Sequence, residues 1–489
     1  MPGVPDVPPA IRAAYDPERF RADGHRLIDA LADQLGQWQA REGVVLPWRE
    51  PGEARAAWAA EPLEGGELVD DLARIARAST ALAHPRCMAH QVAPPVPGAA
   101  LAELVSALLN NGMAVAEMGP AAVPIELAVI RWMCDRIGLP TGAGGVLTSG
   151  GSLGNLTALL AMRQARAGFD VWQAGAHAGP PLAVIVPSDA HYSIARTLRV
   201  MGWGDGGAIA APVDAHHRLT GRAVEEALAR AHSTGRRVLG VIAAAGSTAT
   251  GAFDPLDELA DVAAAHGLWL HVDAAHGGGV ALSATHRHLL RGIERADSVV
   301  WDAHKLLMMP AMITAVLFRD EAHAYEAFAQ QASYLFVDPG AGAARAGAAA
   351  RWWDLGQRTL ECTKRMMAIE LWTALRVHGE AWFGDVVDRQ AALARALAAR
   401  LDAAPDFELA LAPELNIVCY RHVPAGVTGA ALDAHNRALR ARVVEDGRFY
   451  IVGTELPGGF HLRSTIMNPL TEERDLDDLL VHLRSLCPA

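Results

Sequence analysis

Apolar residues in the middle of the chain form short β-branched runs that alternate with stretches of helical periodicity. Apolar runs of this length between helical stretches are typical of βαβ units, in which a helix crosses over between parallel strands. This part of the chain therefore predicts an α/β fold, with a mostly parallel sheet and helices on both faces. The expected strands cover 182–186, 238–244, 268–273, 298–301 and 313–318, and the expected helices cover 153–167, 194–201, 223–232 and 256–266.

Different patterns flank this middle part. Residues 16–40 and 68–82 have apolar positions at helical spacing, which predicts amphipathic helices that need a partner surface, and 47–62 predicts an extended linker between them. A long helix over 362–378 precedes short strand-like segments mixed with helices, which predicts a small α+β domain. We expect an N-terminal helical wrapping and dimerisation segment over 1–80, a large domain over 81–380 and a small C-terminal domain over 381–489.

Composition and charge narrow the class of protein. The chain has 489 residues, of which 51% are hydrophobic and 20% charged, so it can bury large cores. A net charge of −12 disfavours a nucleic-acid or anionic-membrane partner, but leaves room for a local site that binds one small anion. The sequence has no secretory signal pattern, no apolar run of ~18 residues and no CxxC pair among its five cysteines. We therefore expect a cytoplasmic protein with reduced thiols.

A Ser/Gly turn leads into a helix in the segment LTSGGSLGNLTAL. Gly150 and Gly151 would let backbone N–H groups approach a ligand, Ser152 adds a hydroxyl, and a helix N-terminus favours an anion. A phosphate cradle is one interpretation, and a tight turn with a serine N-cap is the other. The spacing matches neither GxxxxGK[ST] nor GxGxxG, so a nucleotide site gains little support.

Two expected strand ends deliver a carboxylate and an amine. In LHVDAAHGG, Asp273 ends a strand, and the small Ala275 after it leaves room for a flat ring. In SVVWDAHKLL, Lys305 follows a strand within a nearly apolar run, where burial favours the neutral, nucleophilic amine. A structural capping aspartate and a snorkelling surface lysine are the alternatives.

One cofactor requires all three features on such a fold. Pyridoxal 5'-phosphate needs a lysine for its aldehyde, a carboxylate for its pyridine nitrogen and a helix N-terminus for its phosphate. The order of phosphate cradle, acid and amine along the chain therefore predicts a pyridoxal-phosphate enzyme.

From about residue 84 onward the chain resembles the group II pyridoxal-phosphate-dependent amino acid decarboxylases. These include glutamate, cysteine sulfinate, 2,4-diaminobutyrate and aromatic amino acid decarboxylases. The motifs that carry the resemblance are HPRCMAH, LTSGGSLGNLTAL, PSDAHYSIAR, GSTATGAFDP, LHVDAAHGG, DSVVWDAHK, QASYLF and RTLECTKRM. The resemblance implies a fold-type I enzyme of aspartate-aminotransferase-like architecture, assembled as a homodimer with its active site at the subunit interface. It also implies a carboxy-lyase that converts an L-amino acid to its amine and CO2.

The resemblance further implies residue roles. Lys305 would hold the cofactor as an aldimine, Asp273 would pair with the ring nitrogen, and His191 would stack on the ring. Tyr334 matches a loop tyrosine that reprotonates the quinonoid carbon, and the low-complexity tract 340–350 suits a lid over the site. The remaining implied cofactor contacts are Gly150, Gly151, Ser152, Ser247, Ala275 and His304.

Three departures from the family pattern bear on the cofactor and the substrate. Asp302 stands where members commonly have asparagine, and it stays a cofactor-site candidate if its charge is turned away from the phosphate or neutralised. Lys364 and Arg365 stand near a position where a substrate-carboxylate arginine is expected, although a lysine lacks the bidentate fork. His90 and Gln91 are candidate substrate contacts and make this segment closer to diaminobutyrate decarboxylases. The substrate is left open between 2,4-diaminobutyrate and an acidic amino acid.

Other chemistries fit the sequence less well. A zinc cluster of His271 and His276 with His286 and His288 has no supporting cysteine or carboxylate spacing, so we predict no metal in the site. On the same fold, the alternatives are an aldehyde synthase, which couples decarboxylation to oxidative deamination, and an aminotransferase. Tyr334 favours simple decarboxylation.

Overall fold

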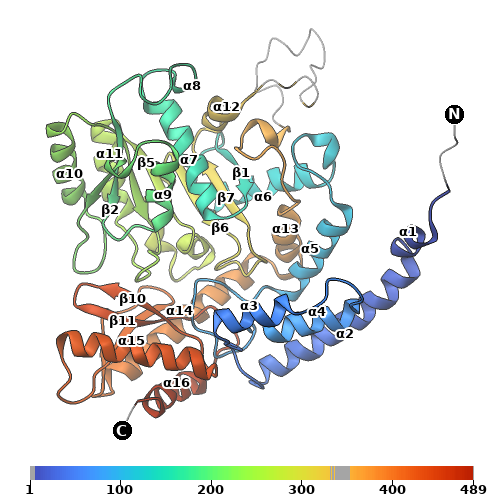
Figure 1. Ribbon diagram of the computed structural model, residues 1–489. Helices are drawn as coiled ribbons and strands as arrows, with labels where there is room; N and C mark the ends of the chain where they lie inside the picture. The colour runs from blue at the N-terminus through green and yellow to red at the C-terminus, as the bar shows by residue number, and fades with distance from the viewer. Residues whose placement is uncertain (1–5, 331, 333–334, 336–352, 488–489) are drawn as a thin grey trace.

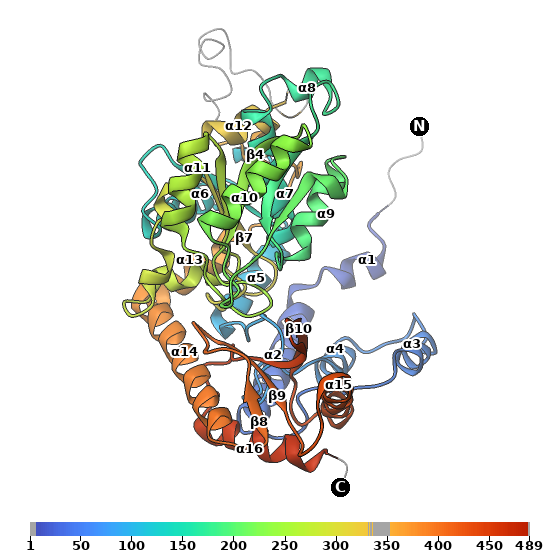
Figure 2. The ribbon, with the colours of Figure 1, turned by 90° about the vertical axis from the view of Figure 1, so that its left-hand side faces the viewer.

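The structure consists of three parts that follow one another along the chain. The computed structural model describes residues 6–330, 332, 335 and 353–487. A helical N-terminal segment precedes a large α/β part and a small α+β part (Figure 1). The N-terminal helices after the first one lie beside the small part, although the two are far apart in the sequence (Figure 2). The domain limits at 80 and 380 stay a prediction, because Phe383 and Val387 also pack into the core of the large part.

A seven-stranded sheet forms the centre of the large part. Its order is β1-β7-β6-β5-β4-β2-β3, and the pairs from β3 to β6 are parallel, whereas β7 runs antiparallel to both of its neighbours. The mostly parallel sheet predicted from the alternating pattern is confirmed. The strands are β1 (Gly144–Thr148), β2 (Leu182–Pro187), β3 (Ala208–Ala211), β4 (Arg237–Ala244), β5 (Trp269–Asp273), β6 (Ser298–Asp302) and β7 (Thr314–Phe318).

Helices bury both faces of this sheet. In β4, Val241 and Ala243 pack into one core cluster and Ile242 between them packs into another, because side chains alternate along a strand. The Ile242 face is covered by α7 (Gly151–Arg166), α9 (Tyr192–Val200) and α12 (Ala322–Phe328), with the short α8 (Val171–Ala174) at its edge. The other face is covered by α5 (Pro97–Leu109), α6 (Ala122–Arg136), α10 (Gly221–Ser233), α11 (Leu256–His266) and α13 (Ala368–His378).

The small part is a four-stranded antiparallel sheet of order β10-β11-β9-β8 with helices packed on it. A separate apolar core joins the sheet to these helices through residues such as Leu397, Tyr420 and Leu476. The predicted α+β character is confirmed. Its elements are α14 (Glu380–Asp402), β8 (Phe407–Leu409), β9 (Ile417–His422), α15 (Gly429–Asp446), β10 (Val452–Leu456), β11 (Gly459–Thr465) and α16 (Glu473–Ser485).

The N-terminal segment is tied to the small part. Arg41 donates two hydrogen bonds of 2.8 Å to the buried carboxylate of Asp475, and the Val45 N–H donates to the Gly447 carbonyl at 2.8 Å. The extended linker predicted over 47–62 is wrong in its middle, because Pro51 fits a first helical turn and alanines follow it. The segment contains α1 (Pro9–Ala14), α2 (Pro17–Gln39), α3 (Pro51–Ala59) and α4 (Leu68–Ala78).

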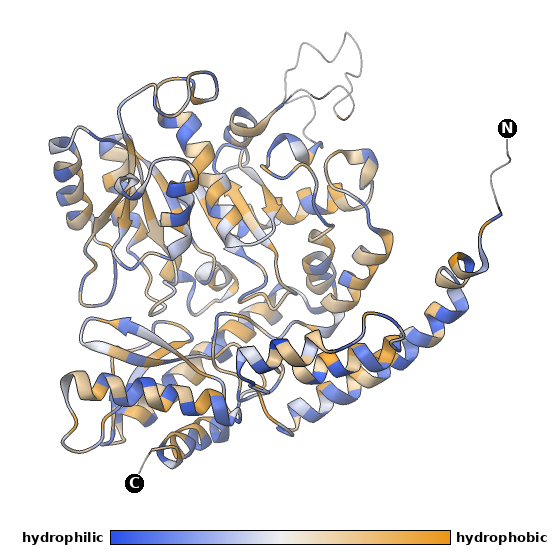
Figure 3. Cartoon of the chain, in the orientation of Figure 1, coloured by the Kyte–Doolittle hydropathy of each residue, from blue (hydrophilic) through white to orange (hydrophobic). Residues whose placement is uncertain are grey.

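Hydropathy follows this architecture. The central strands are largely apolar, whereas polar and apolar residues are mixed along α2 and α4 (Figure 3). Within the described part of the chain, no helix is both long enough and apolar enough to cross a membrane.

Candidate active site

A cavity of about 170 Å³ opens where the carboxyl ends of β4, β5 and β6 meet the N-termini of α7 and α9. Ligands bind at this position in open α/β sheets. Gly150, which was also predicted, immediately precedes α7. The cavity brings together nine of the ten predicted cofactor residues: Gly151, Ser152, His191, Ser247, Asp273, Ala275, Asp302, His304 and Lys305.

The N-terminus of α7 forms an anion-binding edge of the cavity. Gly150 is the N-cap, with φ +103°, a conformation that strains any residue with a Cβ. A Cβ on Gly151 would lie 3.3 Å from both carboxylate oxygens of Asp302 and would narrow the cavity there. The first-turn N–H groups of this 16-residue helix have no intrahelical partner and are available for a phosphate.

Asp273 ends a continuous hydrogen-bond chain through the core. Asn155 Nδ2 donates to Asp273 Oδ2 at 3.0 Å, and His271 Nε2 lies 2.9 Å from Asn155 Oδ1. The Ser298 hydroxyl lies 2.8 Å from His271 Nδ1 and accepts from Trp269 Nε1 at 2.8 Å. Burial lowers the pKa of His271 to about 4, so the ring is neutral and donates through Nε2 to Asn155. This hydrogen-bond network therefore directs the Asn155 amide donor at the Asp273 carboxylate.

Sequence reasoning missed Asn155. It lies one helical turn after Gly151, is 1% exposed and also donates to the Ser193 hydroxyl at 3.1 Å. An amide inside the apolar run LGNLTALL was the available signal, because a buried polar side chain requires partners.

His191 lines the cavity at the start of α9. Its Nδ1 lies 2.8 Å from the Ser193 hydroxyl and also accepts from the Ser193 N–H at 3.3 Å. Burial lowers the pKa of His191, which favours the neutral ring. Because Ser193 also bonds to Asn155, His191 and Asp273 are positioned by one network.

Asp302 lines the cavity and has three polar partners. Its Oδ2 lies 3.2 Å from Lys305 Nζ and 3.6 Å from His304 Nε2, and its Oδ1 accepts a hydrogen bond from the Thr314 hydroxyl. These contacts offset part of the negative charge that Asp302 places beside the phosphate site. They also hold the Lys305 amine within the cavity.

Two small residues and a tight turn complete the site. Ser247 follows Gly246, which has a φ of +83°. A Cβ added at Gly246 would lie 2.9 Å from the Gly277 nitrogen. The Ser247 hydroxyl lies 3.0 Å from the Thr250 hydroxyl. The Ala275 N–H donates a 3.1 Å hydrogen bond to Asp273 Oδ1, which fixes the backbone at Ala275. A flat ring in this cavity would thus have an amine, a carboxylate and a helix N-terminus around it. This donor set fits pyridoxal 5'-phosphate.

The model of the pyridoxal-dependent decarboxylase conserved domain matches residues 53–423. The chain belongs to this family. It is a carboxy-lyase that acts on an amino acid, and its cofactor is pyridoxal 5'-phosphate. The predicted family, fold type and cofactor are confirmed.

Relatives of this decarboxylase act on different amino acids. A cysteine sulfinic acid decarboxylase from Rattus norvegicus is 33% identical over 458 residues, covering 90% of this chain and 91% of the relative. An L-2,4-diaminobutyrate decarboxylase from Rhizobium meliloti (strain 1021) is 33% identical over 386 residues, covering 79% and 74%. The solved structure of mouse CSAD has a TM-score of 0.88 at 30% identity and covers 96% of this chain and 99% of its own.

The cavity of this decarboxylase does not include Lys364 or Arg365. Lys364 is buried, and its ammonium pairs with the buried carboxylate of Glu126 and donates to the Leu147 carbonyl. Arg365 is half-exposed and pairs with Glu103 at 2.6 Å. These contacts give no support to the predicted substrate-binding role of either residue within one chain.

His90 and Gln91 lie against the small part. His90 Nε2 is 3.0 Å from the Tyr450 hydroxyl, and Gln91 is buried, with no hydrogen-bond partner for its Nε2 among the described residues. Tyr334 and the tract 340–350 lie outside the described residues.

Sequence reasoning also missed Arg463, a buried arginine on β11. It is 6% exposed, and neither its Nε nor its Nη2 has a hydrogen-bond partner in the described part of the chain. Burial, together with the charges of Lys305 and Arg463, lowers the pKa of His276 on the cavity wall to about 3. Arg463 lies within β11, whose sequence FHLRST gives no sign of a site, so only the fold brings the residue within electrostatic range of the cavity.

Proposed function

We propose that this decarboxylase removes the α-carboxyl group of an L-amino acid with an acidic side chain. The observation that carries this proposal is the buried Arg463 guanidinium with two nitrogens that lack hydrogen-bond partners among the described residues. An unpaired buried charge is costly, and a carboxylate or sulfinate is the group that a guanidinium fork binds best. Substrate binding would supply the missing partner.

The charges around Arg463 support the same substrate class. Burial lowers the pKa of His90, and the nearby charges of Arg463 and Arg440 lower it further. Arg440 also has a buried Nε without a hydrogen-bond partner within the described ranges. Two guanidinium groups close enough to His90 to lower its pKa attract an anionic side chain and repel the ammonium of 2,4-diaminobutyrate.

The chain's own residues have separate roles in the reaction. Bound pyridoxal phosphate supplies an electron sink for the electron pair left when the Cα–carboxylate bond breaks. Lys305 holds the cofactor, the N-terminus of α7 binds its phosphate, and Asp273 holds the proton on its ring nitrogen. His191 lies on the cavity wall, where it fixes the plane of the cofactor ring. Asp302 positions the Lys305 amine during the period from substrate binding to product release.

Tyr334 is proposed as the acid that returns a proton to Cα. Delivery of this proton gives the amine as product. Loss of the proton donor would allow the aldehyde to form instead. Analysis of the products therefore distinguishes a decarboxylase from the aldehyde synthase and aminotransferase alternatives.

A homodimer with the active site at its interface is proposed as the working form. Its support is an apolar face on α5, where Leu101, Leu104, Val105 and Leu108 are 54%, 46%, 49% and 64% exposed. An exposed apolar face of this kind is typical of a surface that a second copy covers.

The substrate proposal is tested by CO2 release from a panel of glutamate, aspartate, cysteine sulfinate, 2,4-diaminobutyrate, ornithine, lysine and aromatic amino acids. We expect turnover of an acidic member and a KM increase of at least tenfold in Arg463→Gln, because the buried partner of the side-chain anion is lost. Arg421→Gln, on the adjacent strand β9, is the control for a charge change in the same sheet. If only 2,4-diaminobutyrate is turned over, the proposed acidic substrate class is wrong, whereas the assignment as a decarboxylase still holds.

A further inference from the structure

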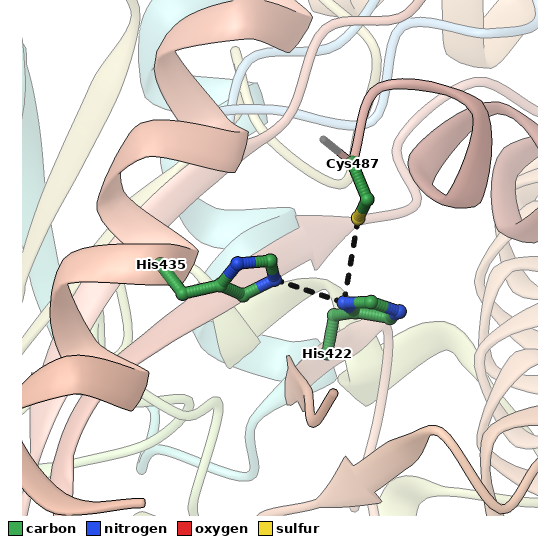
Figure 4. A group of neighbouring side chains, drawn as sticks. All are labelled: His422, His435 and Cys487. Carbon is green, nitrogen blue, oxygen red and sulfur yellow. Dashed lines mark hydrogen bonds between the residues drawn. The ribbon is translucent and has the colours of Figure 1, made fainter. Parts of the chain in front are cut away.

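A cluster of two histidines and a cysteine lies in the small part and is not part of the catalytic cavity (Figure 4). His422 ends β9, His435 lies on α15, and Cys487 follows α16. One nitrogen of each histidine and the cysteine sulfur all lie within 4.8 Å of one another. His422 Nδ1 is 2.9 Å from His435 Nε2 and 3.5 Å from Cys487 Sγ.

The two separations that involve His422 Nδ1 are close to those of a zinc tetrahedron. With Zn–N bonds of about 2.0 Å and a Zn–S bond of about 2.3 Å, tetrahedral angles place two nitrogens about 3.3 Å apart and nitrogen and sulfur about 3.5 Å apart. The separation of His422 Nδ1 and Cys487 Sγ already matches. The two imidazole nitrogens need to separate by only about 0.4 Å, which a small rotation of the half-buried His435 ring provides.

Other residues orient the ligand atoms. Asp406 lies 3.6 Å from His422 Nε2, the nitrogen that faces away from the cluster, and Arg484 holds this carboxylate through two hydrogen bonds of 2.7 Å. A carboxylate on the second nitrogen is the usual outer partner of a metal-binding histidine. Asn436 Oδ1 accepts from the His422 N–H at 2.9 Å, and its Nδ2 donates to the His422 carbonyl at 3.0 Å, so α15 is fixed against β9 beside the cluster.

We propose that His422 Nδ1, His435 Nε2 and Cys487 Sγ bind one Zn²⁺ ion, with the fourth position open to water. Imidazole and thiolate ligands suit Zn²⁺ and disfavour the oxygen-preferring Mg²⁺ and Ca²⁺. Binding releases the Cys487 thiol proton to solvent and moves the proton between the two histidines onto His435 Nδ1, so each ligand atom offers a lone pair. The ion would join β9, α15 and the end of α16.

The test measures Zn²⁺ binding to the holoenzyme by calorimetric titration and by metal analysis after dialysis. We expect one Zn²⁺ per chain that is lost in Cys487→Ser and in His435→Gln. Asp406→Asn should weaken Zn²⁺ affinity by about 10- to 100-fold, because it removes the outer partner of His422. Cys362→Ser changes an exposed cysteine outside the cluster and should leave the affinity unchanged.

Co²⁺ gives a spectroscopic signal that reports the metal–thiolate bond directly. Co²⁺ bound to wild-type protein should show a thiolate-to-metal charge-transfer band that Cys487→Ser abolishes, whereas decarboxylase activity stays at the wild-type level. Equal Zn²⁺ affinity in wild type and Cys487→Ser, or no binding to wild type, would overturn the site. Circular dichroism of each variant establishes that a loss of binding is not a loss of fold.

Discussion

The Lys305 ammonium nitrogen lies 3.2 Å from Asp302 Oδ2, so the amine expected to hold the cofactor is already placed by a carboxylate three residues earlier. The same carboxylate lies close to the N-terminus of α7, where a Cβ on Gly151 would be 3.3 Å from both of its oxygens. Asp302 therefore has two opposing effects. It orients the amine, and it places negative charge beside the phosphate site.

This conflict predicts the effect of Asp302→Asn. The amide can still accept from the Thr314 hydroxyl, but its loss of charge should tighten cofactor binding about fivefold, or about 1 kcal/mol. Cofactor affinity measured by fluorescence titration checks this. Thr314→Val, which removes the hydroxyl and keeps the charge, is the matched control, and weaker binding in Asp302→Asn would contradict the electrostatic argument.

Lys364→Met separates a structural role from a substrate-binding role. The substitution leaves the Glu126 carboxylate buried without its ionic partner, so we expect the free energy of unfolding to fall by about 3–5 kcal/mol. KM should stay unchanged in the folded fraction. Arg365→Gln breaks a partly exposed pair and should cost about 0–1 kcal/mol. A large KM increase in Lys364→Met at wild-type stability would restore the substrate role predicted from the sequence.

The pKa of His271 predicts a pH-dependent contribution to stability. A histidine whose folded pKa is about 4 and whose unfolded pKa is about 6.5 binds fewer protons when folded, so its contribution is complete above 6.5 and decreases as pH falls toward 4. At pH 5 the loss is about 2 kcal/mol relative to pH 7. Burial raises the pKa of Asp254 to about 7, and this group changes stability with pH in the opposite direction. The contribution of His271 therefore has to be measured by comparing wild type with a variant of that residue.

Urea unfolding of wild type and His271→Gln at pH 7 and pH 5 makes this comparison. The stability difference between the two proteins should shrink by about 2 kcal/mol at pH 5. The exposed His288→Gln is the control and should leave the difference constant. An unchanged difference for His271→Gln would mean that its ring is not buried in the neutral form.

Tyr334→Phe tests the proposed proton donor. We expect slower formation of the amine, because the phenol proton no longer reaches Cα. In aerated buffer we also expect more aldehyde and ammonia, with dissolved O2 as the two-electron oxidant that is reduced to H2O2. Chromatographic quantification of the three products checks the ratio, and Tyr325→Phe provides a tyrosine control outside the cavity. If the product ratio does not move, Tyr334 is not the donor.

The sequence predicts the central sheet and most of the cofactor site for the same physical reason. Buried parallel strands are short apolar runs, and functional residues follow at their carboxyl ends, so Asp273 and Lys305 could be placed on neighbouring strand ends before the fold was known. The partners of Lys364 and Arg463 could not be predicted in this way. Glu126 lies 238 residues from Lys364 in the sequence, and Arg463 reaches the neighbourhood of His276 only because β11 packs beside the large part.

The central claim is that Lys305 carries the cofactor in the cavity between α7 and β5. Visible absorbance and peptide mass spectrometry after borohydride reduction of the wild-type protein and Lys305→Ala test it directly. We predict that wild type shows the absorbance band of lysine-bound pyridoxal phosphate and a cofactor-modified Lys305 peptide, and that Lys305→Ala lacks both. An unchanged band in Lys305→Ala, or a cofactor attached to another lysine, would contradict the account.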